Sequence, residues 1–542
     1  AVIPIYDEIY SFGKIKHYFA RHEQGSVHAA DGYARVSGKV GVCLATSGPG
    51  ATNLVTGIMT AHMDSIPLLA ITGQVRSNLL GRDAFQETDI VGITVPITKG
   101  NYLVQNIKDI PRIIKEAYFI ASTGRPGPVL VDIPNDIQQQ EISYEEFNKL
   151  FDKEVQLEGY DPTYVGHPVQ IKRALSLIKK AKKPLIIAGA GVIKSQASKE
   201  LFELANKMDM PVTTTLLGLG AFPENHELSL GMLGMHGTVP ANYATDEADL
   251  VIAAGIRFDD RIAGNPSKFC ERAKIIHIDI DPAEIDKNKK ADVPIVGDLK
   301  NVLSEINKEL EPQDHKEWTD KVKEWKKEYP LAHRDVGKDK LLPQEVLKAI
   351  NDILDGDTIV VTDVGQHQMW AAQYMTYKNA NSIVTSGGAG TMGFGVPAAI
   401  GAQVGARDKK VVLIVGDGGF QMTLEEIMMI RQYNLPVKVV IINNSFLGMV
   451  RQWQELFKDR RYSFVDLECN PDFVKIADAY GIKSERLKTK EDLENKLKDL
   501  ILSDEGVILD CIVEREENVF PMIPAGKTVS QMIGKKGVLE ND

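Results

Sequence analysis

The residues best suited to chemistry are a carboxylate and an amide, each of which follows an apolar run. Asp417 comes after the predicted strand Val411–Val415, and Asn444 comes at the end of the predicted strand Val437–Ile442. The predicted helix Thr423–Asn434 joins the two strands. Because ligands bind at the carboxyl ends of strands in open α/β sheets, we expect both side chains at one edge of a parallel sheet.

The chemistry that these residue types predict is binding of a divalent cation and a diphosphate. Carboxylate and amide oxygens, with the nearby backbone carbonyl of Phe446, are hard ligands that Mg²⁺ prefers, and phosphate oxygens and water complete its octahedron. Gly418 and Gly419 let the backbone approach a diphosphate closely. The alternative is a Gly-rich turn followed by an unrelated Asn pair.

Three other segments carry weaker signals. Glu23, in RHEQG, opens a predicted helix, where a carboxylate serves either acid–base chemistry or only a solvated helix start. Met392, in the segment GTMG, is by itself more readily a core residue than a ligand contact. Gly189-Ala190-Gly191 follows a strand and is a candidate dinucleotide turn or only a tight turn, because the third glycine of that fingerprint is replaced by Lys194.

The elements that must position these residues repeat as a short apolar run, a Gly-rich turn and a helical pattern, which is typical of parallel α/β sheets. The 542 residues are enough for three such domains, which we expect at 1–155, 166–310 and 341–542. A linker is expected over 141–165, and a surface helix with a linker over 305–340. Further predicted elements are the helix Ala51–Met63 and the strands Val40–Thr46, Pro67–Thr72, Val129–Ile133, Leu185–Ala188, Val212–Thr215, Leu250–Ala254, Ile275–Ile280, Thr358–Thr362, Ile383–Thr385 and Val507–Val513.

Composition excludes several classes of protein. Hydrophobic residues at 43% and charged residues at 25% are ordinary for a globular protein and exclude wholesale disorder. A net charge of −11 without a basic block disfavours nucleic acid as a partner.

No apolar run reaches the roughly 18–20 residues of a membrane span. Four dispersed cysteines and no visible signal peptide favour a reducing compartment, so we expect a cytoplasmic protein. Ala1 is not an initiator Met and begins helix-like sequence, so we expect a preceding segment.

The GDG…NN arrangement resembles the signature of thiamine-diphosphate (ThDP) enzymes, and the resemblance extends over essentially the whole chain. It implies an α/β fold of three doubly wound parallel-sheet domains: a pyrimidine-binding, a middle FAD-binding and a diphosphate-binding domain. It also implies ThDP and Mg²⁺ at a subunit interface of a homodimer or tetramer. Glu23 would hydrogen-bond N1′ of the aminopyrimidine, and Met392 would bend the cofactor. The implied ThDP-binding residues are Val364, Gly365, Gln366, His367, Gly390, Met392, Asp417, Gly418, Gly419, Asn444 and Gly448, with Asp417, Asn444 and Phe446 as metal ligands.

Within these enzymes the chain resembles the acetohydroxyacid synthase (acetolactate synthase) family. The segments that carry this resemblance are SGPGATN (47–53), DAFQE (83–87), GRPGPV (124–129), GMHG (234–237), RFDDR (257–261), VGQHQMW (364–370), GMVRQWQ (448–454) and VFPMIPAG (519–526). The family is a transferase that decarboxylates pyruvate and joins the hydroxyethyl group to pyruvate or 2-ketobutyrate. That reaction is the first common step of valine, leucine and isoleucine biosynthesis. A small regulatory subunit is an expected partner.

The resemblance also assigns substrate and flavin contacts. Trp453 would shape the pocket for the second 2-keto acid, Arg261 would face its carboxylate, and Gln86 and Met449 would line the active site. A core Trp and an exposed ion pair are the alternatives. The RFDDR segment favours the FAD-binding type, in which FAD catalyses no net redox step. The implied FAD contacts are Arg125, Gly189, Ala190, Gly191, Thr215, Leu216, Gly234, Met235, His236, Gly255, Arg257, Asp259, Asp279, Asp298, Gln368 and Met369.

Two positions depart from the family pattern, in which Pro is usual where Arg76 stands and Lys where Asn135 stands. Both line the family's substrate channel, so we expect altered binding of channel-blocking herbicides.

Two other activities are alternatives. One is a different ThDP reaction, such as that of pyruvate oxidase or a 2-keto acid decarboxylase, although the adjacent His-His pair usual in decarboxylases does not occur. The other is a non-catalytic paralogue, against which intact Glu23, Asp417 and Asn444 argue.

Overall fold

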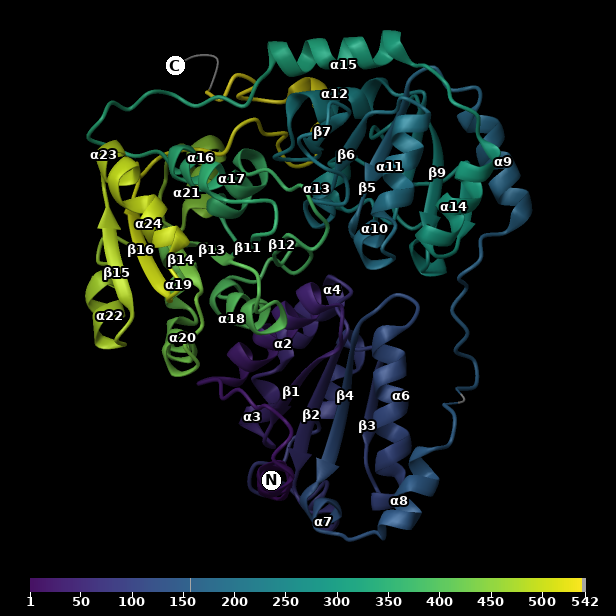
Figure 1. Ribbon diagram of the computed structural model, residues 1–542, viewed down its shortest axis with the longest axis vertical. Coiled ribbons are helices and arrows are strands. Elements are labelled where there is room, and N and C mark those ends of the chain that lie inside the picture. Colours follow the sequence, from purple (N-terminus) through teal and green to yellow (C-terminus); the bar gives the residue numbers. More distant parts are fainter. Residues whose placement is uncertain (156, 539–542) are drawn as a thin grey trace.

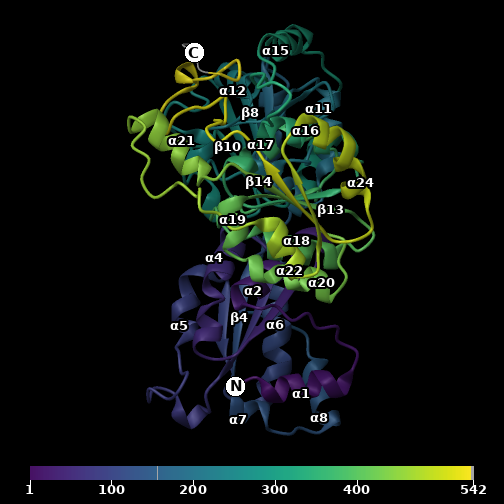
Figure 2. The ribbon, with the colours of Figure 1, turned by 90° about the vertical axis from the view of Figure 1, so that its left-hand side faces the viewer.

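The computed structural model describes residues 1–155 and 157–538, which form three units, each with one parallel sheet (Figure 1). The first unit lies at one end of the molecule, and the second and third lie side by side beyond it, as Figure 2 shows from another direction. Residue 156 of the predicted linker and residues 539–542 of the predicted third domain lie outside the described residues. Each sheet lies within one predicted block, while the domain limits themselves stay predictions.

The first sheet has the strand order β1-β2-β4-β3. β4 is buried along its whole length, as its sequence, apolar except for Asp132, predicts for a parallel strand. The strands are β1 (Gly41–Ala45), β2 (Leu68–Gln74), β3 (Gly100–Leu103) and β4 (Pro128–Pro134), and the helices are α1 (Ile3–Phe12), α2 (Glu23–Ser37), α3 (Pro49–Thr52), α4 (Val55–Met63), α5 (Ile90–Thr94), α6 (Ile110–Ser122), α7 (Asn135–Gln138) and α8 (Tyr144–Phe151).

The second sheet has the order β10-β9-β8-β5-β6-β7. Its central strands β5 and β8 are fully buried between helices. The strands are β5 (Pro184–Ala188), β6 (Val212–Thr214), β7 (Ser229–Met232), β8 (Leu250–Ala254), β9 (Lys274–Asp279) and β10 (Val293–Val296), and the helices are α9 (Pro168–Ile178), α10 (Ala190–Lys194), α11 (Ser198–Lys207), α12 (Val239–Glu247), α13 (Asp260–Ala263), α14 (Leu299–Glu309) and α15 (Lys316–Glu328).

The third sheet has the order β12-β11-β13-β14-β16-β15. The strands are β11 (Ile359–Thr362), β12 (Ile383–Val384), β13 (Val411–Gly416), β14 (Lys438–Asn443), β15 (Lys483–Leu487) and β16 (Val507–Ile512), and the helices are α16 (Pro343–Ile353), α17 (Gln366–Tyr374), α18 (Gly395–Gly405), α19 (Asp417–Gln421), α20 (Ile427–Gln432), α21 (Gly448–Phe457), α22 (Phe473–Ala479), α23 (Lys490–Asp492) and α24 (Lys498–Leu502).

The first and third units join through α2 and α18. A Cβ atom on Gly32 would lie 2.2 Å from the carbonyl oxygen of Ala398, and one on Gly401 would lie 1.8 Å from that of Ala29. Only glycine permits this close approach of two helix backbones. The contact fixes how α18 of the third unit lies against the first unit.

Four strands were missing from the sequence prediction, and all four lie at sheet edges: β3, β7, β10 and β15. An edge strand pairs on one side only, so its sequence is less apolar than that of a central strand. β15, with the sequence KSERL, has one buried residue, and β3 has none. The apolar runs used for prediction therefore find the middle of each sheet better than its borders.

Three predicted helical or linker segments need correction. The predicted helix Ala51–Met63 is two helices, α3 and α4, and the predicted linker 141–165 contains α8, which Ser143 caps. The predicted helix Thr423–Asn434 is wrong at its start, because the helical segment begins at Asp417 and is interrupted near Thr423. At this interruption the Thr423 hydroxyl donates to the carbonyl of Gly393 at 2.8 Å. A side-chain bond of this kind competes with regular helical structure.

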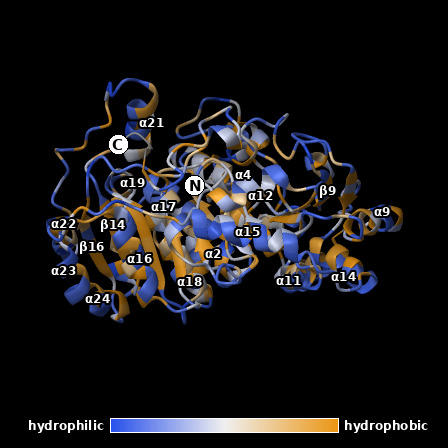
Figure 3. Ribbon diagram, turned by 90° about the horizontal axis from the view of Figure 1, so that it is seen from above, coloured by the Kyte–Doolittle hydropathy of each residue, from blue (hydrophilic) through white to orange (hydrophobic). Residues whose placement is uncertain are grey.

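The predicted surface helix at 305–340 is α15, which carries a blue, hydrophilic outer side in Figure 3. It is not only a surface element, because Trp318 is buried and its indole N–H donates to the carbonyl of Pro184 at 3.0 Å. None of the described helices is both long and apolar enough to cross a membrane. Cys43, Cys270 and Cys511 are buried free thiols and Cys469 is exposed.

Candidate active site at the junction of the three units

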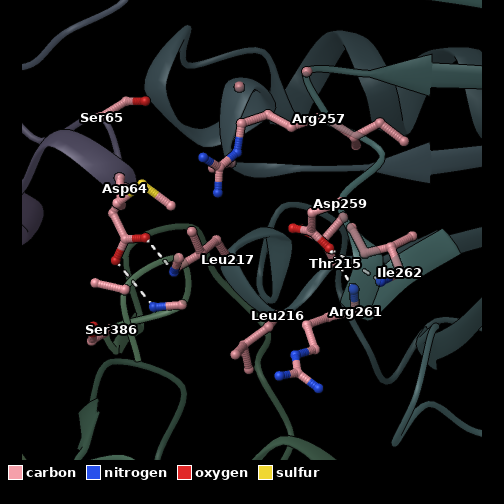
Figure 4. A pocket seen from close by; sticks show the side chains of 18 of the residues that line it. Asp64, Ser65, Thr215, Leu216, Leu217, Arg257, Asp259, Arg261, Ile262 and Ser386 are labelled. Carbon is pink, nitrogen blue, oxygen red and sulfur yellow. Dashed lines mark hydrogen bonds between the residues drawn. The ribbon is translucent and has the colours of Figure 1, made fainter. Parts of the chain in front are cut away.

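A cavity of about 1150 Å³ lies where the three units meet. Figure 4 shows Asp64 and Ser65 of the first unit, Arg257 and Arg261 of the second, and Ser386 of the third around it. A concave site that several units build in common is the usual place for a cofactor or substrate. Most of the predicted flavin contacts and several predicted ThDP and substrate contacts line this one cavity.

The predicted metal ligands lie at the carboxyl ends of two central strands of the third sheet. β13 and β14 are parallel neighbours, with Gly416 opposite Ile442. Asp417 and Asn444 follow the two strand ends, and both side chains are buried. The adjacent placement agrees with the βαβ pattern, and the role in metal binding stays a prediction.

The glycines beside Asp417 and Asn444 have no room for a side chain of their own. A Cβ atom on Gly418 would meet Leu447 at 2.7 Å, and one on Gly448 would meet Asn444 at 2.9 Å. The Asn444 Oδ1 atom accepts a hydrogen bond from the backbone N–H of Phe446 at 3.1 Å, which fixes the turn that carries the Phe446 carbonyl. Among the described residues, no group of three or more His, Cys, Asp and Glu side chains forms a metal cluster, so a cation here depends on the mixed Asp–Asn–carbonyl set.

One contact of Asp417 was absent from the sequence prediction. Asn470, in the loop before α22, donates from Nδ2 to the Asp417 carboxylate at 2.6 Å. Burial raises the pKa of Asp417 to about 6, and this hydrogen bond acts in the opposite direction. A bound cation would favour the ionised carboxylate further. No motif spacing signals Asn470, because an irregular loop carries it.

The segment after β11 supplies the predicted contacts Val364, Gly365, Gln366 and His367. Gln366 donates to the Gln452 side chain at 2.8 Å, and its Oε1 accepts from Asn444 at 3.3 Å. The Nε2 atom of His367 is buried and has no hydrogen-bond partner among the described residues. Burial lowers the pKa of His367 to about 3, so this imidazole is neutral at pH 7.

Asp363, which the sequence prediction missed, organises the next loop. Its buried carboxylate accepts backbone N–H bonds from Val364 at 2.7 Å, Gly393 at 3.1 Å and Gly395 at 2.7 Å. Burial raises the pKa of Asp363 to about 6. These bonds tie the end of β11 to the segment that carries Gly390 and Met392. Gly390 has a φ of 62°, which favours glycine, and Met392 lines the cavity.

Most predicted flavin contacts line the cavity and come from the second unit. Two do not line it: Gly189 and Gly234. A Cβ atom on Gly189 would lie 2.2 Å from the carbonyl oxygen of Gly255, and one on Gly234 would lie 2.5 Å from that of Arg261, so these glycines permit close backbone packing behind the wall. The predicted flavin contacts that line the cavity are Arg125, Ala190, Gly191, Thr215, Leu216, Met235, His236, Gly255, Arg257, Asp259, Asp279, Asp298, Gln368 and Met369.

The charged residues of this group differ in their partners. Arg125 forms ion pairs with Asp281 at 3.0 Å and Glu284 at 2.6 Å, so its charge is already compensated. The carboxylate of Asp259 caps α13 by accepting from the N–H groups of Arg261 and Ile262, as the dashed lines in Figure 4 show. Burial raises the pKa of Asp279 to about 6.

The predicted second-substrate contacts line the same cavity. Met449 and Trp453 are four residues apart on α21 and therefore share one helix face. Trp453 packs with Met235, Phe520 and Met522. The Arg261 side chain is 64% exposed. Among the described residues it forms an ion pair with Asp260 at 3.7 Å and donates to the sulfur of Met235 at 3.6 Å, which leaves other N–H groups of the guanidinium for an anion.

Glu23 and Gln86 do not line this cavity. Glu23 begins α2 and accepts a hydrogen bond from the Asn53 amide at 3.0 Å. Gln86 is exposed, has a φ of 59° and lies against Gly48, where an added Cβ atom would meet its backbone at 2.8 Å. Both residues contact the SGPGATN segment (47–53) of the first unit, Glu23 through Asn53 and Gln86 through Gly48. Within one chain, the structure therefore separates these two predicted catalytic residues from the cavity residues.

Comparison with protein families matches each unit to a domain of one enzyme class. Residues 1–93 match "Thiamine pyrophosphate enzyme, N-terminal TPP binding domain", residues 171–306 the central domain, and residues 363–511 the "C-terminal TPP binding domain". The fold and the matched domains define a thiamine pyrophosphate enzyme.

Individual relatives narrow this class. The chain is 48% identical to the "Probable acetolactate synthase large subunit" of Methanocaldococcus jannaschii, over 98% of this chain and 91% of the relative. It is also 48% identical to the "Acetolactate synthase large subunit" of Lactococcus lactis subsp. lactis (100% and 93%) and of Corynebacterium glutamicum (98% and 86%). The chain belongs to the acetolactate synthase large subunits. The predicted family, fold class and type of enzyme are thereby confirmed.

Proposed function

We propose that the chain decarboxylates pyruvate and transfers the hydroxyethyl group to a second 2-keto acid, with ThDP, Mg²⁺ and FAD as cofactors. The products are 2-acetolactate from pyruvate and 2-aceto-2-hydroxybutyrate from 2-ketobutyrate, on the route to branched-chain amino acids. The observation that carries the proposal is the common cavity, which combines predicted flavin contacts with Arg261 and Trp453. Membership of the acetolactate synthase large subunits supports it.

Asp417, Asn444 and the carbonyl of Phe446 would hold Mg²⁺, and Gly418 leaves room for the diphosphate. When bound, ThDP supplies the electron sink for decarboxylation. The buried oxygen ligands and the exclusion of a Cβ atom at Gly418 support this assignment.

Glu23 would act on a cofactor that is bound mainly by a neighbouring chain. Its carboxylate would hold a proton at N1′ of the aminopyrimidine, as general acid–base chemistry requires. Glu23 does not line the cavity of its own chain. Active sites between subunits, and thus a homodimer or a higher homo-oligomer, follow from the resemblance to thiamine-diphosphate enzymes.

The flavin would occupy the part of the cavity that the second unit lines. Arg257 would meet the diphosphate and Asp279 a ribose hydroxyl. His236 has a buried Nδ1 atom that no residue in the described part of the chain hydrogen-bonds, which supports a ligand at this wall.

Arg261 would bind the carboxylate of the second 2-keto acid, since a guanidinium can form a bidentate pair with it. Trp453, Met449 and Gln86 would surround the rest of that substrate. A small regulatory subunit and a cytoplasmic location complete the proposal, and the words "large subunit" in the relatives' names support the first.

The test is a product analysis of the full chain with ThDP, Mg²⁺ and FAD, supplied with equal pyruvate and 2-ketobutyrate. The expected result is both acetohydroxy acids, with 2-aceto-2-hydroxybutyrate in excess. Acetaldehyde alone would assign a decarboxylase. Acetyl phosphate with peroxide would assign an oxidase.

A further inference from the structure

The turn after α4 joins the first unit to the loop that carries Met392. We call residues 386–392 the cofactor loop; Ser386, Gly387, Gly388, Ala389, Gly390 and Met392 line the cavity. Asp64, the C-cap residue of α4, accepts hydrogen bonds from the backbone N–H groups of Gly387 at 3.1 Å and Gly388 at 2.7 Å (Figure 4).

The position of Asp64 is costly unless the loop is present. A carboxylate at a helix C-terminus faces the negative end of the helix dipole, and Asp64 is 2% exposed. A buried charge must be paired. Besides the two loop N–H groups, Asp64 pairs with Arg35 at 2.8 Å. The loop therefore supplies two of the three donors that keep this carboxylate in place.

The fit between Asp64 and the loop leaves no space. A Cβ atom on Gly388 would lie 2.9 Å from Asp64 Oδ1, and one on Gly387 would lie 2.7 Å from Leu217 of the second unit. The glycine pair is thus held between the first and second units, and a side chain at either position would force Asp64 or Leu217 to move.

A second contact from the same helix holds the other end of the loop. The hydroxyl of Thr60, one turn before Asp64, lies 2.7 Å from the hydroxyl of Thr391 in a buried pair. The Thr391 N–H in turn donates to the Ser386 hydroxyl at 3.1 Å, which closes the loop on itself. Helix α4 therefore contacts the loop at both ends, on either side of Gly390.

We propose that Asp64 and Thr60 are positioning residues through which the first unit sets the geometry of the cofactor loop. Because Met392 and Gly390 belong to this loop, Asp64 and Thr60 act on ThDP through them. The inference rests on the proposed ThDP function and extends it to two residues outside the cofactor-binding motifs.

The test compares Asp64→Asn with Asp31→Asn in the full chain. Both carboxylates are buried and both pair with Arg35, Asp31 at 2.5 Å, but only Asp64 also bonds the loop. The readouts are the Kd of ThDP with saturating Mg²⁺ by calorimetry and the rate of proton exchange at C2 of bound ThDP at saturation. The thermal midpoint of each variant reports the structural effect separately.

Asp64→Asn removes one acceptor of the loop bonds, so we expect about a tenfold higher Kd for ThDP and about tenfold slower exchange. Asp31→Asn should leave both values within about twofold, even where it lowers the thermal midpoint. Thr60→Val, which keeps the shape and removes the hydroxyl, should change both readouts in the same direction by about threefold.

Equal effects of Asp64→Asn and Asp31→Asn would overturn the positioning role and leave only a buried ion-pair network. Wild-type exchange with Thr60→Val and Asp64→Asn, if both variants are folded, would do the same. Absence of ThDP binding by the unaltered chain would instead overturn the proposed function, and the inference with it.

Discussion

Asn470 donates a 2.6 Å hydrogen bond to the carboxylate of Asp417, although 53 positions separate the two residues. Asp417 follows β13, whereas Asn470 lies in the loop before α22. The contact orients the carboxylate toward the sheet edge that also carries Asn444. A residue outside the GDG…NN pattern thus takes part in shaping the predicted metal site.

Replacement of Asn470 with Ala should weaken binding of the Mg²⁺–ThDP pair about tenfold, because a hydrogen bond to a charged group is lost. Calorimetric titration of the variant with ThDP at fixed Mg²⁺ measures the effect. Cys469→Ser, at the exposed neighbouring position, is the matched control and should bind as the unaltered chain does. Equal affinity in both variants would exclude a role of Asn470 at this site.

Replacement of Glu23 with Gln should slow proton exchange at C2 of bound ThDP by about 10²–10⁴-fold, since the general acid–base partner is removed. The amide keeps the size of the side chain, so the fold should persist, as circular dichroism can verify. Glu8→Gln, an exposed change on α1, serves as the control. Unchanged exchange in Glu23→Gln would refute the assigned role.

Replacement of Trp453 with Leu should lower the preference for 2-ketobutyrate over pyruvate about 5- to 100-fold, because packing against one extra methyl group is lost. Competition between the two 2-keto acids, with both products quantified, gives the ratio. Phe457→Leu, one turn further on α21, removes a ring that does not line the cavity but packs on Trp453, with 5.1 Å between the ring centroids, so it should change the preference less than Trp453→Leu. An unchanged preference in Trp453→Leu would contradict the role of the Trp453 side chain.

We expect the free energy of unfolding to depend on pH through Glu224, which lies at the contact between the second and third units. It accepts a hydrogen bond from the backbone N–H of Tyr377 at 2.7 Å, and burial raises the pKa of Glu224 to about 8. A carboxyl group whose pKa is higher in the folded state binds more protons there. Its contribution is therefore complete below the ordinary pKa of 4.5 and is lost as the pH rises to about 8.

Glu224→Gln keeps an acceptor for Tyr377 and cannot ionise. The variant should gain stability relative to the unaltered chain between pH 5 and pH 8, which urea unfolding midpoints at both values can show. Glu227→Gln, a nearby exposed change, controls for net charge. A constant difference between Glu224→Gln and the unaltered chain across this range would contradict the prediction.

The sequence alone determined the sheet centres and the local motifs. Strands such as β5, β8 and β13 are buried on both faces, so they read as continuous apolar runs that can be recognised without partners. Asp417 and Asn444 were found for the same reason, because each directly follows such a strand. The edge strands β3 and β15 were not predicted, because an edge strand pairs on one side only and neither GNYL nor KSERL is a continuous apolar run.

Only the tertiary structure decided which distant side chains complete these motifs. Asn470 on Asp417 and Asp64 on Gly387 pair across 53 and 323 positions, and no spacing rule connects them. These pairs form because α2 and α18 pack closely and because loops from the three units meet at one place. Local sequence specifies which segments form strands and helices. A buried carboxylate such as Asp64 is stable only with hydrogen-bond donors, and these come from segments that are distant in sequence.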